Sequence, residues 1–403
     1  MNQYTQGGRS MNKYSSLFSQ LLSLFPRLEF ERLVRQTGTE YAAKGFSSWG
    51  HYVAMLFCQL GQAHSLREIC NGLASCFGKL KHLGISRGPK RSTLAYANEH
   101  RSWELFQKVF YGLLNRCRGE FVGKTKFRFK NKLMSFDATV IELCASLFDW
   151  AKFRRTKGAV KLHLLLDHEG YLPQYAHITE GKVHEVNVLK KLRFSPGAIV
   201  VIDRGLVDYQ LFGEWTEEGV YFVTRLKDNA TYRVVKRLPV PENRNILKDE
   251  IIRLTGFKAR KHCSCRLRRT EVFDKDKGEQ IVLLTNHLGF GATTISATYK
   301  DRWQIEIFFK VLKQNLRIKT FVGTTANALK IQIWTALIAV LLLKYLKIRS
   351  RYNWSLSNLV ALLRLNLFSY RDLWEWIDRP IDPPPVIQEQ EQLELSFAQL
   401  DSR

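Results

Sequence analysis

The sequence predicts a mixed α/β protein whose sheet follows an all-helical N-terminal region and is interrupted by a β-rich insertion. Three changes of pattern along the chain predict this order. Residues 15–117 space their apolar side chains three and four positions apart, as one face of a helix does. From residue 133 onward, runs rich in Val, Ile and Leu alternate with turns and short helical patterns. Between about 228 and 290 the runs become shorter and are separated by Pro, Gly and Asn, which favours a group of hairpins.

The length of 403 residues predicts two or three domains. We place a helical domain at 1–122, the sheet with its insertion at 123–348, and a C-terminal helix with a loose tail at 349–403. The tail is rich in Pro, Gln and Glu, a composition that does not favour a packed core. With 45% hydrophobic residues, the rest of the chain can bury a full core.

The helical region contains two local signals. "SLRE" predicts a capping box, with Ser65 as the N-cap and Glu68 reaching back to the helix start. After the basic turn "SRGPKR" at 86–91, a helix is expected to begin at Ser92 or Thr93 and to run through "SWELFQKVFYGLL". A helix, a basic turn and a second helix resemble a helix-turn-helix DNA-binding module, and a plain helical bundle fits the pattern equally well.

Basic residues occupy alternate positions in "KTKFRFKNK" at 124–132. A strand would place all of them on one face, with Phe127 and Phe129 on the other. A solvated edge strand guarded by lysines is one interpretation. The net charge of the chain favours a strand that follows DNA phosphates. The basic residues of this segment are Lys124, Lys126, Arg128, Lys130 and Lys132.

Five strands are expected to form the sheet, with a short helix at 184–194 after the third. The first three, at 133–143, 158–170 and 171–181, look antiparallel. The last two, "GAIVVIDRG" and "GVYFVTRLK", are continuous apolar runs typical of strands buried on both faces. The combination predicts a mixed sheet.

The stretch "YKDRWQIEIFFKVLKQNLRI" at 299–318 predicts an amphipathic helix with one acid, Glu306, in a basic row. On an isolated helix, the pairs of Glu306 with Arg302 and Lys310 would be weak ion pairs on a solvated face. The apolar stripe comprises Ile305, Phe308, Phe309, Leu312 and Leu316, and the polar face comprises Tyr299, Arg302, Glu306, Lys310, Lys313 and Arg317.

Two further helices are expected at 326–348 and 355–377. The apolar run at 333–343 is shorter than the roughly 18 residues of a membrane span, so we expect a buried helix.

The N-terminus lacks the layout of a signal peptide, which predicts a cytosolic chain. Seven scattered cysteines argue against a disulfide framework, and "HCSC" at 262–265 lacks the second Cys/His pair of a zinc site.

The charge of the chain is strongly positive. Lys and Arg number 62 against 37 Asp and Glu, a formal net charge of +25. Such an excess is typical of proteins that bind a polyanion, either nucleic acid or an anionic membrane surface.

Two acids could be partners of Glu306. Asp137 lies within the first predicted strand, and Asp203 ends the most apolar one. Singly, each fits a turn or a cap. A carboxylate that interrupts an apolar run is costly unless it is paired or binds a metal, and sites in α/β sheets gather at strand ends. Carboxylates from two strands and from a helix packed on them would form a site for two Mg²⁺ ions that act on phosphates.

Tyr299, Arg302, Glu306 and Lys313 resemble, in order and spacing, the Tyr-Arg-Glu-Lys signature of the DDE transposases of bacterial insertion sequences, in the branch called the fourth insertion-sequence family. Asp137 in "DATVIEL" and Asp203 in "VIDRG" resemble the first and second acids of that family. Leu206 departs from it, because an aromatic residue is expected after "DRG". The resemblance covers roughly 130–345 and implies a ribonuclease-H-like fold with a β-domain inserted between Asp203 and Glu306.

The resemblance implies an enzyme for cut-and-paste transposition that cleaves DNA ends and transfers strands. Two Mg²⁺ ions, or Mn²⁺ in their place, would be held by the catalytic acids Asp137, Asp203 and Glu306. The partner would be double-stranded DNA, both the terminal inverted repeats and the target, bound by a homodimer in the bacterial cytoplasm at the nucleoid, with no membrane. The expected DNA-binding residues are Tyr299, Arg302, Lys310, Lys313, Arg204, Lys126, Arg128 and Lys130.

Two other functions remain open at this point. A DNA-binding protein that has lost catalysis would still occupy terminal repeats, although the three intact acids disfavour it. A structure-specific nuclease on the same fold would cut DNA without element ends and would not join the cut ends to a target.

Overall fold

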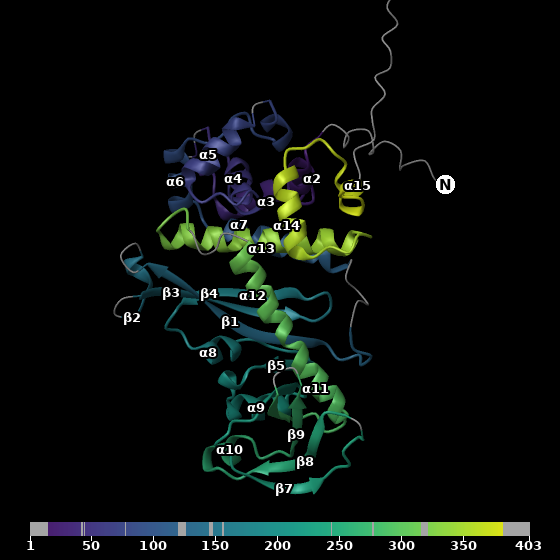
Figure 1. The fold of residues 1–403 in the computed structure, drawn as a ribbon. Helices are drawn as coiled ribbons and strands as arrows, with labels where there is room; N and C mark the ends of the chain where they lie inside the picture. The colour runs from purple at the N-terminus through teal and green to yellow at the C-terminus, as the bar shows by residue number, and fades with distance from the viewer. Residues whose placement is uncertain are drawn as a thin grey trace, which may run out of the picture.

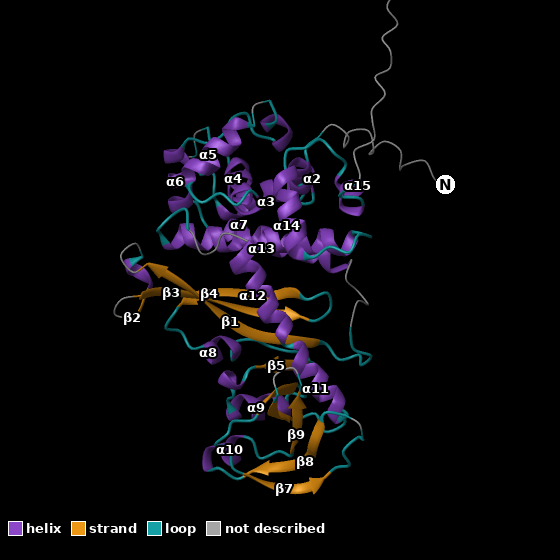
Figure 2. Cartoon of the chain, in the orientation of Figure 1, coloured by secondary structure: helices purple, strands orange, loops and turns teal. Residues whose placement is uncertain are grey.

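The structure is a computed structural model, and it describes residues 15–41, 43, 45–76, 78–119, 126–144, 148–154, 157–242, 244–275, 278–315 and 321–381. The helices α2 to α7 and α13 to α15 gather at one end, a mixed sheet lies next to them, and strands β7 to β9 form the other end (Figures 1 and 2). The predicted tail lies almost entirely outside the described residues.

The helical end combines segments from both halves of the described chain. The backbone N–H groups of Leu17 and Phe18 donate to the carbonyls of Ser369 and Leu367, at 3.1 and 2.8 Å. Its helices are α2 Leu17–Ser23, α3 Arg27–Thr37, α4 Ser48–Leu60, α5 Leu66–Ser75, α6 Arg91–His100, α7 Glu104–Arg118, α13 Ala326–Arg349, α14 Leu356–Asn366 and α15 Leu373–Asp378, with a short 3₁₀ helix at Leu80–Leu83.

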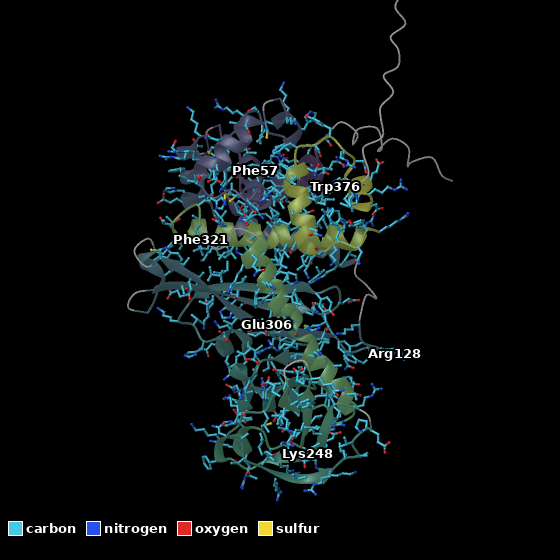
Figure 3. All side chains as sticks on the ribbon, in the orientation of Figure 1. Phe57, Arg128, Lys248, Glu306, Phe321 and Trp376 are labelled. Carbon is cyan, nitrogen blue, oxygen red and sulfur yellow. The ribbon has the colours of Figure 1, made fainter. Side chains whose placement is uncertain are left out.

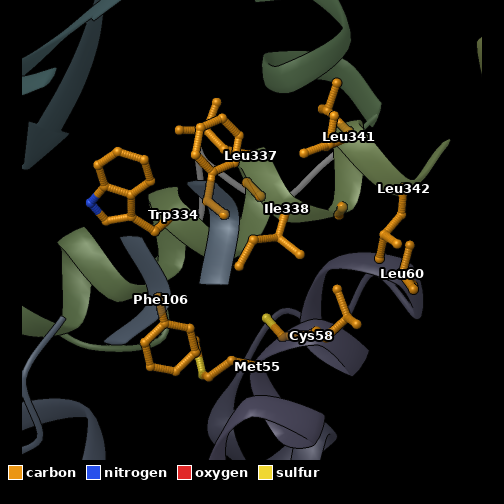
Figure 4. Close-up of a cluster of buried hydrophobic side chains, with 14 of the residues drawn as sticks. Met55, Cys58, Leu60, Phe106, Trp334, Leu337, Ile338, Leu341 and Leu342 are labelled. Carbon is orange, nitrogen blue, oxygen red and sulfur yellow. The ribbon is translucent and has the colours of Figure 1, made fainter. Parts of the chain in front are cut away.

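The long helix α13 is the core of this end. It is the one helix of the described residues that is long and apolar enough to cross a membrane, and 83% of its most apolar 18-residue window is buried inside the protein. Figure 4 shows Trp334, Leu337 and Ile338 of α13 in one cluster of buried side chains with Phe106 of α7 and Met55 of α4. A helix that is apolar all round must be covered on every side. The prediction of a buried helix is confirmed.

The Ser65 cap is also confirmed. The Oγ of Ser65 accepts a hydrogen bond from the N–H of Glu68 at 3.1 Å. The carboxylate of Glu68, however, accepts from the N–H of His64 at 2.8 Å, one residue earlier than the usual reciprocal bond.

The prediction of one helix from Ser92 or Thr93 through "SWELFQKVFYGLL" is wrong in two respects. The helix begins at Arg91 without a side-chain cap. It also ends at His100, and a separate helix, α7, begins at Glu104. The amide of Asn327, in the first turn of α13, donates to the carbonyls of Asn98 and Arg101 at 2.8 and 2.7 Å. These hydrogen bonds satisfy carbonyl groups at the end of α6. The partner is distant in the chain, so the periodicity of the sequence does not predict where α6 ends.

The predicted helix 355–377 is likewise two helices. The side chain of Asp372 caps α15 by accepting from the N–H groups of Trp374 and Glu375. The connecting segment is held by α2, because the amide of Gln20 donates to the carbonyl of Arg371 at 2.7 Å.

Within the described residues, the sheet has ten strands in the order β2-β3-β1-β5-β6-β10-β9-β8-β7, and β4 pairs with β3 beside that path. The pairs β1–β5 and β5–β6 are parallel, and the others are antiparallel, so the predicted mixed sheet is confirmed. The strands are β1 Leu133–Cys144, β2 Lys152–Arg154, β3 Lys157–Asp167, β4 Leu172–Glu180, β5 Ile199–Ile202, β6 Tyr221–Arg225, β7 Tyr232–Arg237, β8 Ile246–Leu254, β9 Leu267–Asp274 and β10 Glu279–Thr285. Between them lie the helices α8 Glu185–Leu189, α9 Tyr209–Glu217 and α10 Phe257–His262.

The predicted strand at 124–132 is wrong over its described part, 126–132, which forms bends instead. The segment still alternates between exposed and covered side chains, although it pairs with no strand. The basic side chains are exposed, while the rings of Phe127 and Phe129 stack 5.1 Å apart and pack on the core. The period of two therefore reports which side chains are covered. It does not report whether a neighbouring strand supplies hydrogen bonds.

We expect Leu337→Ala to lower the free energy of unfolding by about 2–5 kcal/mol, because the side chain of Leu337 is fully buried between α13 and the N-terminal helices. The matched control is Leu365→Ala on α14, whose side chain is 73% exposed, and it should change stability by less than about 0.5 kcal/mol. Denaturant unfolding of both variants measures the difference. Equal small losses would contradict the assignment of α13 to the core.

Candidate active site

Asp137 and Asp203 lie side by side because of the register of two parallel strands. Phe136 of β1 is paired with Ile202, the last residue of β5. An acid follows each of them: Asp137 within β1 and Asp203 directly after β5. Parallel strands project their ends from the same edge of a sheet. The sequence prediction that two acids emerge at neighbouring strands is thus realised by backbone pairing.

The predicted helix at 299–318 is two helices, α11 Ala292–Asp301 and α12 Trp303–Asn315, with Arg302 at the junction. The described part of the apolar stripe, Ile305 to Leu312, is buried as predicted; Leu316 and Arg317 lie outside the described residues. Glu306 is in the first turn of α12, which crosses the sheet (Figure 3).

Arg302 joins two of the three acids. Its guanidinium lies 3.4 Å from Oδ2 of Asp137 and 2.6 Å from Oε1 of Glu306. One turn earlier, the hydroxyl of Tyr299 donates to Oδ1 of Asp203 at 3.3 Å. The polar face that runs from α11 into α12 therefore reaches Asp137, Asp203 and Glu306 through neighbouring side chains.

Burial raises the pKa of Asp137 to about 6. The N–H of Ala138 and the charge of Arg302 oppose this shift, whereas the carboxylates of Glu185 and Asp203 add to it. Burial also raises the pKa of Tyr299 to about 12. Its hydroxyl is thus neutral at ordinary pH and remains a hydrogen-bond donor for Asp203.

Glu185 is an acid of this site that the sequence analysis missed. It begins the short helix α8, and its Oε1 pairs with Nζ of Lys161 at 3.2 Å. Its charge nevertheless contributes to the raised pKa of Asp137. The available signal was an acid at the start of a helix that directly follows a sheet strand.

A cleft of about 400 Å³ opens between β1 and α12. Asp137 and Glu306 lie in its wall together with two of the predicted DNA-binding lysines, while Asp203 is not among the lining residues. The cleft is lined by Asp137, Ala138, Thr139, Glu306, Phe309, Lys310, Lys313 and Gln314.

The predicted DNA-binding residues Arg204, Lys126, Arg128 and Lys130 are not among the residues that line this cleft. Arg204 is partly buried, and its guanidinium pairs with Asp228 at 2.7 Å. Lys126 reaches Asp301, beside Arg302, at 2.8 Å. Arg128 and Lys130 are exposed, and Arg128 extends from the edge of the molecule (Figure 3).

The donor set suits a hard divalent cation, because carboxylate oxygens are the ligands that Mg²⁺ prefers. Within the described residues, no group of three or more acidic, His or Cys side chains is already arranged around a common metal position. The guanidinium of Arg302 lies between Asp137 and Glu306 instead. The three acids therefore fit a metal site by their chemistry, and Arg302 would have to release two of them.

Two family models match the chain. A model described as "Transposase DDE domain" matches residues 128–342, a range that contains all three acids, and one described as a "Domain of unknown function" matches residues 13–86.

Curated relatives are transposases. The chain is 33% identical over 327 residues to the Sinorhizobium fredii protein named transposase y4zB, covering 79% of this chain and 88% of the relative. It is 28% identical over 272 residues to a Geobacillus stearothermophilus protein named as a transposase for insertion sequence element IS5377, covering 66% of this chain and 70% of the relative. Among solved structures, a piggyBac transposase synaptic complex with hairpin DNA matches with a TM-score of 0.42 and 10% identity, over 94% of this chain and 84% of that chain.

The raised pKa of Asp137 predicts that its ionised form destabilises the protein. The folded state binds this proton more tightly than the unfolded chain, where Asp titrates near pH 3.9. Stability should therefore fall as the pH rises from about 4 to about 6 and remain lower above that range. We expect Asp137→Asn to raise the free energy of unfolding at pH 8 by about 1–3 kcal/mol, and to lose this gain near pH 4.

Denaturant unfolding between these two pH values measures the effect. The matched control is Asp228→Asn, whose side chain is 86% exposed and whose replacement should leave the pH dependence unchanged. An Asp137→Asn variant less stable than wild type at pH 8 would refute the electrostatic interpretation.

Proposed function

Because the chain belongs to the DDE transposases of bacterial insertion sequences, we propose that it binds the terminal inverted repeats of its element, cleaves the DNA at those ends and transfers the strands to target DNA. We assign it to the fourth insertion-sequence family on the spacing of Tyr299, Arg302, Glu306 and Lys313. The sheet around β1 and β5 would be its ribonuclease-H-like core. It would act as a homodimer on DNA at the bacterial nucleoid.

One observation carries the proposal: the polar face of the α11–α12 segment contacts both Asp137, within β1, and Asp203, directly after β5. Tyr299 bonds to Asp203, and Arg302 bridges Asp137 and Glu306. Three carboxylates from two parallel strands and a helix are thus gathered beside a cleft that also carries lysines. This combination favours chemistry on a phosphate group over a purely structural set of ion pairs.

Asp137, Asp203 and Glu306 would hold two Mg²⁺ ions, or Mn²⁺, which when bound supply an activated water or hydroxyl and neutralise charge on the phosphate. Lys310 and Lys313 would bind the phosphates of the DNA that enters the cleft. Arg302, once released from the acids, would be free to contact the same backbone.

The flanking basic residues would extend this contact along the duplex. Lys126, Arg128 and Lys130 come from the segment before β1, and Arg204 follows Asp203 directly. Phosphate contacts of this kind determine affinity and position without reading the base sequence. Recognition of the ends therefore needs another part of the chain.

We expect Asp203→Ala to abolish Mg²⁺-dependent cleavage of DNA that carries an element end while leaving end binding within a few-fold of wild type. The matched control is Asp228→Ala, an exposed acid near the same edge of the sheet, and it should cleave normally. Single-turnover cleavage and a gel-shift assay measure the two quantities. Wild-type cleavage by Asp203→Ala would show that Asp203 is not a metal ligand.

The same assay distinguishes the alternatives with the wild-type protein. Binding of ends without any Mg²⁺-dependent nicking would identify a protein that has lost catalysis. Equal cutting of DNA without ends, with no joining to a target, would identify a structure-specific nuclease.

We place end recognition in residues 1–122, at the turn "SRGPKR" and helix α6. Arg87, Lys90 and Arg91 are exposed there, and the start of a helix adds partial positive charge for a phosphate. These helices share their core with α13, α14 and α15. The test should therefore use the full-length chain.

Replacing Arg87, Lys90 and Arg91 together by Ala should reduce the preference for terminal-repeat over random DNA. It should also lower the salt slope of log K by about one for each phosphate that the variant no longer binds. The matched control removes the same charge from α10, where Lys258, Arg260 and Lys261 are exposed. Titrations at several salt concentrations measure both effects. An equal loss of preference in the two triple variants would leave only non-specific electrostatics at α6.

A further inference from the structure

A polar cluster with a buried centre adjoins the candidate site in the chain, because Ser135 lies two residues before Asp137 and Asp301 lies directly before Arg302. The Nδ1–H of His168 donates to Oδ2 of Asp301 at 2.6 Å, and Nε2 of His168 is 2.6 Å from Oγ of Ser135. Asp301 also accepts from Nζ of Lys126 at 2.8 Å and from the hydroxyl of Tyr171 at 3.1 Å. We call Ser135, His168, Asp301, Tyr171 and Lys126 the junction anchor.

The order Ser–His–Asp resembles the arrangement that activates a serine nucleophile. Burial excludes that role here, because Ser135 is fully buried, while His168 and Asp301 are only 4% and 2% exposed. No substrate could reach the hydroxyl of Ser135. The hydrogen bonds of this cluster instead hold together the elements that they connect.

The junction anchor connects three elements at the point where the candidate site is assembled. Ser135 is on β1, two residues before Asp137. Asp301 ends α11 and directly precedes Arg302. His168 and Tyr171 belong to the turn between β3 and β4. The break between α11 and α12 is therefore tied to the strand that carries the first acid.

The charge of Asp301 makes this connection strong. Burial alone would raise the pKa of Asp301, but hydrogen bonds from His168 and Lys126 outweigh burial and hold the pKa below its ordinary value. A buried carboxylate with several charge-assisted donors is costly to leave unpaired. The carboxylate of Asp301 therefore has one favourable position. This position also fixes the backbone at the junction of α11 and α12, which begins at the next residue.

A second contact extends the anchor to the helical end. Nζ of Lys344, on α13, donates to the carbonyl of Tyr171 at 2.5 Å and lies 5.3 Å from the ring centre of Phe308 on α12. The β3–β4 turn is thus bonded to α11 through His168 and to α13 through the carbonyl of Tyr171.

We propose that His168 and Asp301 are positioning residues for the candidate active site. They fix the junction of α11 and α12 on β1, and thereby set Arg302 and Glu306 opposite Asp137. This inference rests on the proposed function, because its consequence is the spacing of the metal-binding carboxylates. A shift of about 1 Å in such a group can reduce a rate by about 10²-fold even when the mutated residue is remote.

The test compares His168→Leu and His168→Asn in the full-length protein. Leucine removes both ring nitrogens, whereas the amide of asparagine can donate to Asp301 from nearly the position of Nδ1. We expect His168→Leu to weaken Mn²⁺ binding, measured by calorimetry without DNA, by about 10-fold or more. Single-turnover cleavage should fall in parallel, and His168→Asn should recover part of both losses.

The matched controls are His163→Leu and His163→Asn. His163 is fully buried on β3, the strand that leads to His168, and is paired with Ala138 of β1. Its Nε2 is 2.8 Å from the hydroxyl of Thr179, which is not a member of the junction anchor. These variants should lower thermal stability and leave Mn²⁺ affinity unchanged. Asp301→Asn tests the other partner and should resemble His168→Leu in Mn²⁺ affinity.

Mn²⁺ binding by wild type and by Glu306→Gln tests the proposed function separately from the positioning role of His168 and Asp301. If wild type binds Mn²⁺, Glu306→Gln weakens it, and folded His168→Leu and Asp301→Asn bind like wild type, the positioning role is wrong while the proposed function stands. If wild type binds no Mn²⁺ and cuts no DNA, the proposed function is overturned, and the positioning role with it.

Discussion

The parallel pairing of β1 with β5 is the constraint on which the candidate site depends. It pairs Phe136 with Ile202 and thereby places two acids next to each other at one edge of the sheet. The chain between these strands contributes β3, β4 and α8, since a parallel connection needs a crossover. The same crossover supplies His168 and Glu185. Backbone hydrogen bonding thus creates a concentration of negative charge that the surrounding side chains must balance.

Arg302 provides much of that balance. The protein has a net charge of +25 and therefore an excess of cations, and Arg302 is the cation that lowers the pKa of Asp137. Arg302 is close because the helix breaks beside it, and one guanidinium serves both Asp137 and Glu306. This accounts for the single acid in a basic helix row. Glu306 pairs with Arg302, one turn before it, and Arg302 also pairs with Asp137 on β1.

Sequence patterns predicted the features that depend on local burial. The strands β1 and β5, the buried stripe from Ile305 to Leu312 and the burial of α13 follow from periodicity and composition. The three helix breaks do not, because they are made by distant partners: Asn327 at the end of α6, Gln20 before α15, and His168 at the end of α11. Glu185 was missed for the same reason, since only the folded crossover brings it near Asp137. The sequence resemblance selected the three acids. The cluster that positions them had no signature, because its members are separated by up to 175 residues in the chain.

The helical end and the candidate site are connected through α13. This helix has the composition of a membrane span, but its 24 residues are covered by N-terminal helices on one side and by α12 and α14 on others. Two of its lysines contribute to this packing: Lys330 lies over the ring of Trp103 on the helical side, and Lys344 holds the turn that carries His168 and Tyr171. Lys344 also lies 5.3 Å from the ring centre of Phe308, so α13 contacts both the N-terminal helices and the helix that carries Glu306. The helical end and the segment that carries Arg302 and Glu306 are therefore packed on the same helix.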